Sequence, residues 1–346
     1  MCCLKNRFLS LITLCVIALF LAIPLPSLAQ GEVAFSYVPN HFPAQPDNQQ
    51  IGPAHGGAAI DRAGNIYIST DTQRGILVFG PDGKYLRCFG PTQIHGLYLR
   101  RERDGDYLYA ARPNFHEVLK IKTDGTPAWT MSYPEASGIY TKAEEFNPTN
   151  IVALPDGTIF VADGYGKNYI HKYDRDHKYL KSFGGPGGMP AEDGKFNRCH
   201  GLTVDTRGSK PLLIVCNRES GRVEQWDTDG NLVKVLQRNL RMPATVYVGG
   251  NYVAIGELQG RVTILGKDNS IVAQLGDNPN ASQRANYGLP PAQWTEGICN
   301  SPHGIAIDKS GNVIVSEWSQ FGRLHMFAPS PSSAKSAKSA KSAKKE

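Results

Sequence analysis

The chain has 346 residues, of which 41% are hydrophobic and 20% are charged, so its length allows one or two ordinary domains. Its formal net charge of +6 comes from its ends, because residues 1–29 contribute +2 and residues 335–346 contribute +4, which leaves no net charge on the body between them. A neutral body without a basic stripe gives no support for nucleic-acid binding by the folded part.

Residues 1–29 have the features of a secretory signal peptide. Lys5 and Arg7 give a basic start, residues 8–25 are nearly all apolar, and Ser27-Leu28-Ala29 supplies small residues at the cleavage positions. A membrane anchor is the alternative for so long an apolar run, but the prolines just before the small-residue site favour cleavage. We therefore expect a secreted or periplasmic protein with no stable membrane anchor.

The body of the chain is built on a repeated sequence motif, seen most plainly at residues 301–317. It consists of a polar start, an alternating apolar strand, an Asp/Gly turn and a second strand. Copies begin at His55, His95, His200 and His303, and weaker copies without histidine begin near Asn150 and Thr245. Their spacing of roughly 40 to 60 residues is typical of propeller blades with four strands each. Six copies predict an all-β fold, a six-bladed β-propeller over residues 30–329.

The blades can be followed in chain order by alternating apolar runs between turn residues. The first has expected strands at 58–61, 66–69, 76–79 and 85–89. Similar runs follow at 107–110, 118–121 and 128–131, at 159–162, 169–173 and 179–183, at 212–216, 222–226 and 232–236, and at 252–255, 261–265 and 271–275. The insertions 134–148, 184–199 and 276–301 fall between blades, so we expect loops on the face where blades are joined.

The last blade has only three strands after His303, ending at 324–327. The alternating run Val33–Val38 is expected to supply the fourth strand, which would close the ring and cover the open edges. Residues 330–346 repeat Ser-Ala-Lys and are expected to be a disordered tail. The tail is either a solubilising end or a tether for a polyanion or cell surface. We expect a monomer.

Four cysteines remain after the signal peptide, namely Cys88, Cys199, Cys216 and Cys299. An oxidising compartment permits two disulfides but does not require them. Cys199 and Cys299 precede equivalent strands and lie at the same end of their blades, although these blades are two apart.

The histidines that open the repeats point to chemistry on one face. His95, His200 and His303 belong to the second, fourth and sixth blades, about 120 degrees apart around a six-fold ring. Three imidazoles that converge on the axis could share a metal ion, and zinc accepts three histidines while leaving one position open. The alternative is that each histidine only hydrogen-bonds a neighbouring blade. For His55, in the first blade, two interpretations stay open: a structural residue or a substrate contact.

The loops between the second and third strands should return to the same face as these histidines. Tyr165 and Arg218 lie in two such loops. A phenol beside a metal ion is a candidate general base, because nearby positive charge stabilises the phenolate, and a guanidinium group binds a carboxylate through two parallel hydrogen bonds. A packing tyrosine and a surface arginine are the alternatives. Arg74 and Arg112 occupy comparable loop positions and are candidates for substrate binding, whereas Asp163 suits a turn.

Four segments carry a resemblance to a known family: residues 160–165, 194–202, 216–223 and 301–305, which contain Asp-Gly-Tyr, Asn-Arg-Glu-Ser-Gly-Arg and the spaced histidines. In them the chain resembles the NHL-type propellers and, within these, peptidyl-α-hydroxyglycine α-amidating lyase. The similarity spans about residues 55 to 328. It implies a zinc ion held by His95, His200 and His303, with Tyr165 as catalytic base and Arg218 as a site arginine that holds a carboxylate.

The resemblance also implies a reaction and a substrate class. The reaction is cleavage of the N–C bond of a C-terminal α-hydroxyglycine, releasing an amide and glyoxylate, so the expected partner is a small molecule or peptide with a carboxylate. In this family an aspartate associated with calcium follows the last zinc histidine. Here that residue is Gly304, which argues against a calcium ion.

Two other functions fit the same fold. A non-catalytic NHL-repeat scaffold would bind a protein, peptide or glycan on this face without needing zinc. A metal-dependent esterase or lactonase propeller would need acidic and amide ligands for calcium at the centre of the channel, for which Asn150 and Glu257 are available. The three histidines fit zinc better than calcium.

Overall fold

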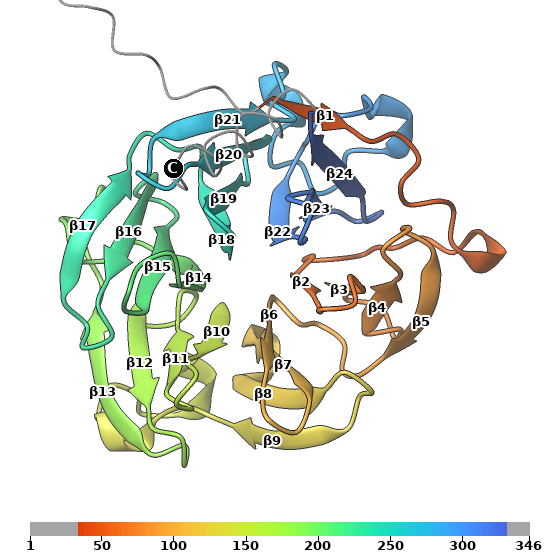
Figure 1. Ribbon diagram of the computed structural model, residues 1–346. Helices are drawn as coiled ribbons and strands as arrows, with labels where there is room; N and C mark the ends of the chain where they lie inside the picture. The colour runs from red at the N-terminus through yellow and green to blue at the C-terminus, as the bar shows by residue number, and fades with distance from the viewer. Residues whose placement is uncertain (1–33, 331–346) are drawn as a thin grey trace, which may run out of the picture. The chain divides into compact units, whose positions relative to one another are not determined.

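The computed structural model describes residues 34–330. They form six four-stranded antiparallel sheets arranged in a ring (Figure 1), so the predicted six-bladed all-β propeller is confirmed. The predicted signal peptide lies outside the described residues, as does the predicted tail apart from its first residue. Among residues 34–330, no helix is long and apolar enough to cross a membrane.

The first three blades are continuous in sequence. Blade one contains β2 (Ala58–Ile60), β3 (Ile66–Ser69), β4 (Ile76–Phe79) and β5 (Tyr85–Phe89). Blade two contains β6 (Gly96–Arg101), β7 (Asp106–Arg112), β8 (Glu117–Lys122) and β9 (Pro127–Met131). Blade three contains β10 (Asn150–Ala153), β11 (Ile159–Ala162), β12 (Tyr169–Tyr173) and β13 (Tyr179–Gly184).

The last three blades complete the ring. Blade four contains β14 (Cys199–Asp205), β15 (Leu212–Asn217), β16 (Arg222–Trp226) and β17 (Leu232–Gln237). Blade five contains β18 (Pro243–Gly249), β19 (Tyr252–Glu257), β20 (Arg261–Leu265) and β21 (Ile271–Leu275). Blade six contains β22 (Pro302–Ile307), β23 (Val313–Glu317), β24 (Leu324–Pro329) and β1 (Phe35–Tyr37). Short 3-10 helices lie in connecting segments, at Pro46–Asn48, Pro113–Phe115, Glu135–Ser137, Ala143–Glu145, Ala281–Gln283 and Pro291–Gln293.

The ring is closed by strands from the two ends of the described chain. β1 pairs antiparallel with β24, with Phe35 opposite Pro329 and Tyr37 opposite Phe327 (Figure 1). The backbone N–H of Ser330 extends this pairing by donating to the carbonyl oxygen of Ala34 at 2.8 Å. The predicted closure by an N-terminal strand is therefore confirmed, and the outer edge of β24 is paired.

Aspartate side chains explain why the turns between strands form where they do. The Asp308 Oδ1 atom accepts hydrogen bonds from the backbone N–H groups of Ser310 and Asn312, at 2.8 and 2.9 Å. Asp61 accepts in the same way from the backbone N–H of Asn65 at 2.9 Å. Such bonds fold a polar segment back on itself and fix the register of the two strands that it joins.

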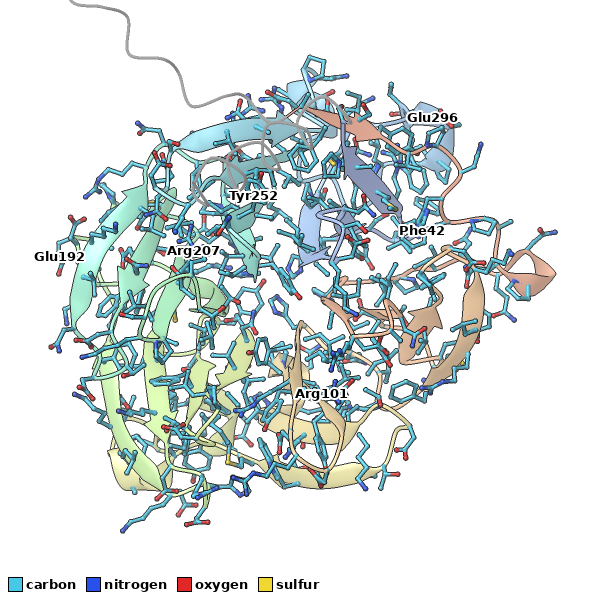
Figure 2. The ribbon with its side chains drawn as sticks, in the orientation of Figure 1. Phe42, Arg101, Glu192, Arg207, Tyr252 and Glu296 are labelled. Carbon is cyan, nitrogen blue, oxygen red and sulfur yellow. The ribbon has the colours of Figure 1, made fainter. Side chains whose placement is uncertain are left out.

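The core lies between neighbouring blades, where buried apolar side chains of facing sheets pack together. Figure 2 shows the side chains around the whole ring. Between blades three and four, the Trp226 ring lies 5.4 Å from the ring of Phe183 and 5.3 Å from that of Phe196. Phe196 comes from the connecting segment 185–198 and is fully buried. The insertion between these blades is therefore anchored in the core, which fixes the residues that follow it.

A glycine after each histidine of the triad His95, His200 and His303 lets the next blade approach. A Cβ atom would lie 2.3 Å from the Thr149 carbonyl oxygen at Gly96, 2.8 Å from that of Ala244 at Gly201, and 1.7 Å from that of Gly56 at Gly304. The next blade's backbone therefore occupies the space of a side chain at all three positions. Close packing of the inner strands requires the His-Gly pair.

Replacing Gly304 with alanine is expected to lower the free energy of unfolding by about 3 kcal/mol or more, because neither backbone can move without displacing a whole blade. Gly208→Ala is the control, since its Cβ would meet only an ordinary contact at 3.8 Å. Urea unfolding of both variants measures the difference. Equal unfolding midpoints would show that the ring tolerates a wider contact at Gly304.

Candidate metal centre

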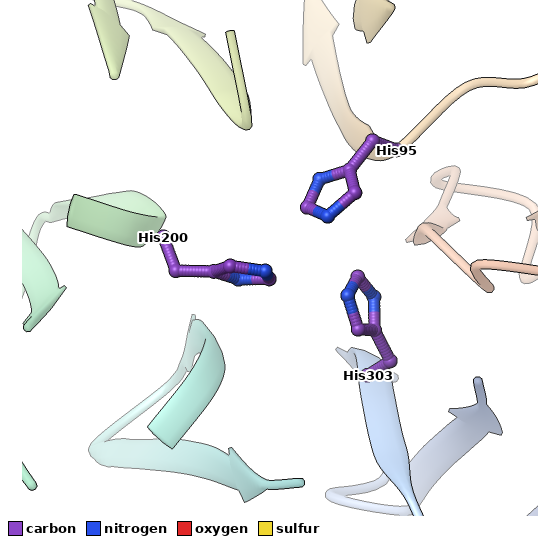
Figure 3. A group of neighbouring side chains, drawn as sticks. All are labelled: His95, His200 and His303. Carbon is purple, nitrogen blue, oxygen red and sulfur yellow. The ribbon is translucent and has the colours of Figure 1, made fainter. Parts of the chain in front are cut away.

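Three buried histidines converge on the propeller axis from alternate blades (Figure 3). His95 directly precedes β6, His200 lies in β14, and His303 lies in β22. One ring nitrogen of each lies within 4.8 Å of those of the other two. The ring centroids are 4.6 to 5.0 Å apart. The structure thus brings together the three residues that the sequence suggested as metal ligands.

Local irregularities in two strands turn these side chains toward the axis. In β14 the pairing with β15 shifts between Cys199 and Leu202, and in β22 the pairing with β23 shifts between Pro302 and Gly304. An extra residue on one strand of an antiparallel pair bends that strand and redirects a side chain. His200 and His303 lie within these bulges.

Hydrogen bonds orient two of the three rings. The His95 Nδ1–H donates to the Thr149 carbonyl oxygen at 2.8 Å, and the His200 Nδ1–H donates to the Ala244 carbonyl oxygen at 2.6 Å. Because a carbonyl oxygen only accepts, Nδ1 carries the hydrogen and Nε2 keeps its lone pair. These acceptors are the carbonyl groups that the adjacent glycines allow to approach.

Burial keeps the triad uncharged. Desolvation, with a smaller effect of nearby His55, lowers the pKa of His95 to about 3. Desolvation also places the pKa values of His200 and His303 well below their usual range. Neutral imidazole is the form that binds metal ions, and three histidine nitrogens are a ligand set of catalytic zinc sites. The triad could therefore hold a metal ion.

Tyr165 and Arg218 lie directly beside the triad. The Tyr165 Oη atom lies 3.1 Å from His95 Nε2 and 2.9 Å from His200 Nε2. It also accepts a hydrogen bond from Arg218 Nη1 at 3.1 Å. The phenol oxygen is thus in contact with two triad nitrogens and one guanidinium group, an arrangement in which it could exchange a proton with a bound molecule.

Asp163 holds the loop that carries Tyr165. Its Oδ1 atom accepts from the backbone N–H of Asn147 at 2.7 Å, and its Oδ2 atom accepts from that of Lys167 at 2.6 Å. The Tyr140 hydroxyl donates to Oδ2 at 2.5 Å, and burial raises the pKa of the Asp163 carboxyl group. This agrees with a turn-forming role. The contribution of Tyr140 was not foreseen, because it comes from the connecting segment 134–148.

A pocket of about 380 Å³ opens beside the triad. It is lined by residues from four blades and from the segments that join them, namely His55, Tyr165, Arg198, Arg218, Met242, Leu258, Ala285, His303 and Trp318. Loops between second and third strands and blade-joining segments therefore contribute to one face, as predicted. Arg198, which stands two residues before His200, and the apolar residues of this lining were not predicted from the sequence.

His55 lies at the rim of this pocket. Its ring centroid is 5.5 Å from that of His95 and 6.0 Å from that of His303. Its Nδ1 atom lies 2.9 Å from Asp71 Oδ2, and 35% of its side chain is exposed. The bond to Asp71 suits a structural residue, and the place in the pocket lining suits a substrate contact.

The other two proposed substrate-binding residues do not line the pocket. Arg74 donates to the Gln50 carbonyl oxygen at 3.1 Å and to the Gln45 side chain at 3.0 Å. Arg112 donates to the Thr92 carbonyl oxygen at 3.0 Å and pairs with Glu117. The partners of Arg74 lie in the segment before blade one, and those of Arg112 lie in the link between blades one and two and in β8.

The residues considered for a calcium site are similarly engaged. Both carboxylate oxygens of Glu257 accept hydrogen bonds from Arg261, and Thr263 donates to one of them. The Asn150 side-chain oxygen accepts from the backbone N–H of Ile151 at 2.8 Å. Gly304 offers no side chain and has no room for one.

The four cysteines within residues 34–330 are free thiols, with Cys88 exposed and the others buried. Cys299, Glu317 and His325 form a second buried group close enough to hold a metal ion. Within it, Glu317 Oε1 accepts the backbone N–H of Asn300 at 2.7 Å and lies 2.9 Å from His325 Nε2. Glu317 therefore has partners, whereas the buried Nδ1 atom of His325 has no hydrogen-bond partner among residues 34–330.

The buried histidines should make the metal-free fold sensitive to acid. Burial lowers the pKa of five of them, His95, His171, His200, His303 and His325. The unfolded chain therefore binds more protons below pH 6.5, and the free energy of unfolding falls as the pH falls. The four whose pKa lies far below the usual value, His95, His171, His200 and His303, each contribute about 1 kcal/mol between pH 6.5 and 5.5. Urea unfolding at the two pH values should differ by several kcal/mol; equal free energies would contradict the burial of neutral rings.

Comparisons with known proteins agree with this architecture. No protein-family model matches the chain. The chain is 25% identical over 332 residues to peptidyl-alpha-hydroxyglycine alpha-amidating lyase 1 of Drosophila melanogaster. The aligned region covers 83% of this chain and 59% of the fly protein. It is 31% identical over 129 residues to the adipocyte plasma membrane-associated protein of Bos taurus, covering 32% of this chain and 30% of the bovine protein. The chain thus spans about three fifths of the fly lyase and a smaller part of the bovine protein.

Solved structures share the fold. The crystal structure of virginiamycin B lyase from Staphylococcus aureus aligns with a TM-score of 0.53 and 15% identity, covering 86% of this chain and 99% of that one. A streptogramin B lyase structure aligns with a TM-score of 0.54 and 14% identity, covering 86% and 98%. The chain is therefore a six-bladed β-propeller related to peptidyl-alpha-hydroxyglycine alpha-amidating lyase, with the fold of the virginiamycin B lyase structures.

Proposed function

We propose that this protein is a zinc-dependent carbon–nitrogen lyase that cleaves N-acyl-α-hydroxyglycines to an amide and glyoxylate. The observation that carries the proposal is the position of the Tyr165 hydroxyl, which contacts two triad nitrogens and the Arg218 guanidinium group at the edge of a pocket. The relation to the amidating lyase of the fly supports it. From the predicted signal peptide, we also propose that the protein acts outside the cytoplasm.

The reaction breaks one bond and moves one proton. Tyr165 acts as the base that removes the hydroxyl proton of the substrate, a carbon–oxygen double bond forms, and the bond to nitrogen breaks. The departing amide nitrogen then takes that proton from Tyr165, so base and acid are the same group. Arg218 donates to the Tyr165 Oη atom at 3.1 Å, a contact that would stabilise negative charge developing on that oxygen during the proton transfer. A zinc ion on the triad would act as a Lewis acid toward the hydroxyl oxygen.

The test is product formation by purified residues 30–346 loaded with zinc. N-Benzoyl-α-hydroxyglycine is the substrate, glyoxylate is measured colorimetrically, and benzamide is measured by chromatography. Equal amounts of both products should appear much faster than without protein, and removal of zinc with a chelator should stop the acceleration. If the zinc-loaded protein gives only the spontaneous rate with acyl groups of several sizes, the proposal is wrong.

A further inference from the structure

The pocket beside the triad has two unlike walls. On one side, the Arg198 and Arg218 guanidinium groups lie 5.6 and 5.5 Å from the centroid of the Tyr165 ring. Apolar side chains make up another part of the lining, namely Met242, Leu258, Ala285 and Trp318. The lining contains no carboxylate. A ligand that fits these walls has an anionic group and an apolar group.

The guanidinium group of Arg218 is already committed. Its Nε and Nη2 atoms donate to Glu219 Oε1 at 3.1 and 2.9 Å, and its Nη1 atom donates to Tyr165 Oη at 3.1 Å. Only 7% of its side chain is exposed. Each of its three nitrogens thus has a partner. To bind a carboxylate through two parallel hydrogen bonds, the Arg218 guanidinium group would have to break its contacts with Glu219 or Tyr165.

The guanidinium group of Arg198 is available. Its Nε atom lies 3.4 Å from Glu219 Oε1, and neither Nη atom has a hydrogen-bond partner among residues 34–330. Its side chain is 47% exposed at the pocket rim. Two unpaired Nη groups on a planar fork are the donors that a carboxylate binds through two parallel hydrogen bonds.

The backbone of Arg198 is fixed, which separates it from an ordinary surface arginine. Its N–H donates to Asn168 Oδ1 at 2.8 Å, its carbonyl oxygen accepts from the Arg218 N–H at 2.9 Å, and its φ of +65° is in the left-handed region. A left-handed non-glycine residue is retained where its surroundings enforce it. The side chain therefore starts from a defined point on the rim.

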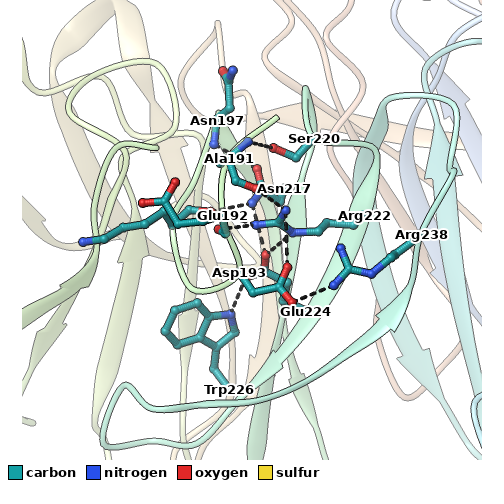
Figure 4. Close-up of polar contacts among 11 residues, drawn as sticks. Ala191, Glu192, Asp193, Asn197, Asn217, Ser220, Arg222, Glu224, Trp226 and Arg238 are labelled. Atoms are coloured by element: carbon teal, nitrogen blue, oxygen red, sulfur yellow. Dashed lines mark hydrogen bonds and ion pairs between the residues drawn. The ribbon is translucent and has the colours of Figure 1, made fainter. Parts of the chain in front are cut away.

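The segment before Arg198 is held by blade four (Figure 4). Arg222 donates to the backbone carbonyl oxygens of Ala191, Glu192 and Lys195. Asn217 adds two bonds, donating to the Lys195 carbonyl oxygen at 2.7 Å and accepting from the Asn197 N–H at 2.9 Å. The segment that delivers Arg198 is thus built into the blade that carries Arg218.

The local charge fits a single anion. The two guanidinium groups share one carboxylate, that of Glu219, at 3.4 and 2.9 Å. One of the two positive charges is left without a carboxylate of its own. An uncompensated charge at a partly buried site favours a ligand group of opposite sign.

From these contacts we propose that Arg198 binds the carboxylate of the substrate, that Arg218 positions Tyr165, and that the substrate carries an apolar acyl group against Trp318 and Leu258. The roles of these residues in the reaction rest on the proposed lyase function. The binding of a carboxylate by Arg198 does not depend on it. It makes the substrates amphipathic N-acyl-α-hydroxyglycines rather than small polar ones. Arg198 thereby becomes a residue that determines specificity.

Steady-state kinetics separate the two arginines. Arg198→Ala should raise KM for N-benzoyl-α-hydroxyglycine about 10- to 100-fold with kcat within about threefold, because it removes a binding contact that ground and transition states share. With the methyl ester of the same substrate, the variant and the wild type should have similar KM values. Arg218→Lys should instead lower kcat more than it raises KM. A fall in kcat with unchanged KM for Arg198→Ala would overturn the assignment.

Binding without turnover tests the assignment independently of the lyase function. N-Benzoylglycine lacks the hydroxyl group and cannot react, so calorimetry gives its Kd directly. We expect Arg198→Ala to weaken it about 10- to 100-fold, and Trp318→Ala to weaken N-benzoylglycine more than N-acetylglycine. Arg238→Ala is the matched control, because Arg238 is 51% exposed, pairs with Asp193 and does not line the pocket.

The outcomes distinguish the two proposals. Binding that depends on Arg198 in a protein that releases no glyoxylate would retain this inference and reject the lyase function. If the protein releases glyoxylate but Arg198→Ala leaves the Kd for N-benzoylglycine unchanged, the lyase function is retained and this inference is rejected. If N-benzoylglycine does not bind to the wild-type protein at all, the inference is wrong.

Discussion

Replacing His200 with alanine is expected to remove the bound metal and to lower kcat for glyoxylate release at least about 10³-fold. A metal ion supplies several kcal/mol of charge stabilisation in reactions of this kind, and His200 is one of three triad nitrogens within 4.8 Å of one another. Metal per chain is measured by elemental mass spectrometry and kcat by the glyoxylate assay. His95→Ala and His303→Ala should behave alike.

The control for these variants is His177→Ala, which changes a histidine that packs on Trp129, at a ring distance of 4.6 Å, outside the triad. It should keep both metal and activity. Circular dichroism is used to check that each triad variant is folded. A folded His200→Ala protein with the metal content of the wild type would contradict a shared metal site.

Replacing Tyr165 with phenylalanine is expected to lower kcat about 10²- to 10⁴-fold, the usual contribution of a positioned general acid or base. The metal content should not change, because the expected ligands are the three histidines. The ring and its packing against Arg198 and Arg218 are kept, so the loss reports on the hydroxyl group alone. Steady-state assays across pH 6 to 9 measure it.

Tyr169→Phe is the matched control for this change, since Tyr169 follows the same loop and opens β12 without lining the pocket beside the triad. It should retain the kcat of the wild type. A kcat of Tyr165→Phe within twofold of the wild-type value would exclude Tyr165 as the base. His55, at the rim of the same pocket, would then be the candidate base.

The sequence predicted the triad because its members occupy equivalent places in a repeat. His95, His200 and His303 each precede a glycine at the start of an inner strand, and the ring brings equivalent places of alternate blades to one axis. The glycines could be recognised in the sequence, but the reason for them could not. It lies in the carbonyl oxygens of the next blade, at 1.7 to 2.8 Å from each missing Cβ.

The loops were less predictable, because equivalent loops share a place on the ring but not a conformation. Arg218 contacts Tyr165, whereas Arg112 ends the second strand of its own blade and donates to the Thr92 carbonyl oxygen. Arg198 reaches the pocket through a left-handed backbone and a segment held by Arg222. Such long-range contacts leave no periodic signal in the sequence.

The measurement that tests the metal centre most directly is anomalous X-ray diffraction at the zinc edge, from crystals of residues 30–346 grown with zinc. We expect one strong peak per chain, within about 2.0 to 2.1 Å of a nitrogen of each of His95, His200 and His303. A peak only at Cys299, Glu317 and His325, or no peak at the triad in a zinc-soaked crystal, would contradict the account.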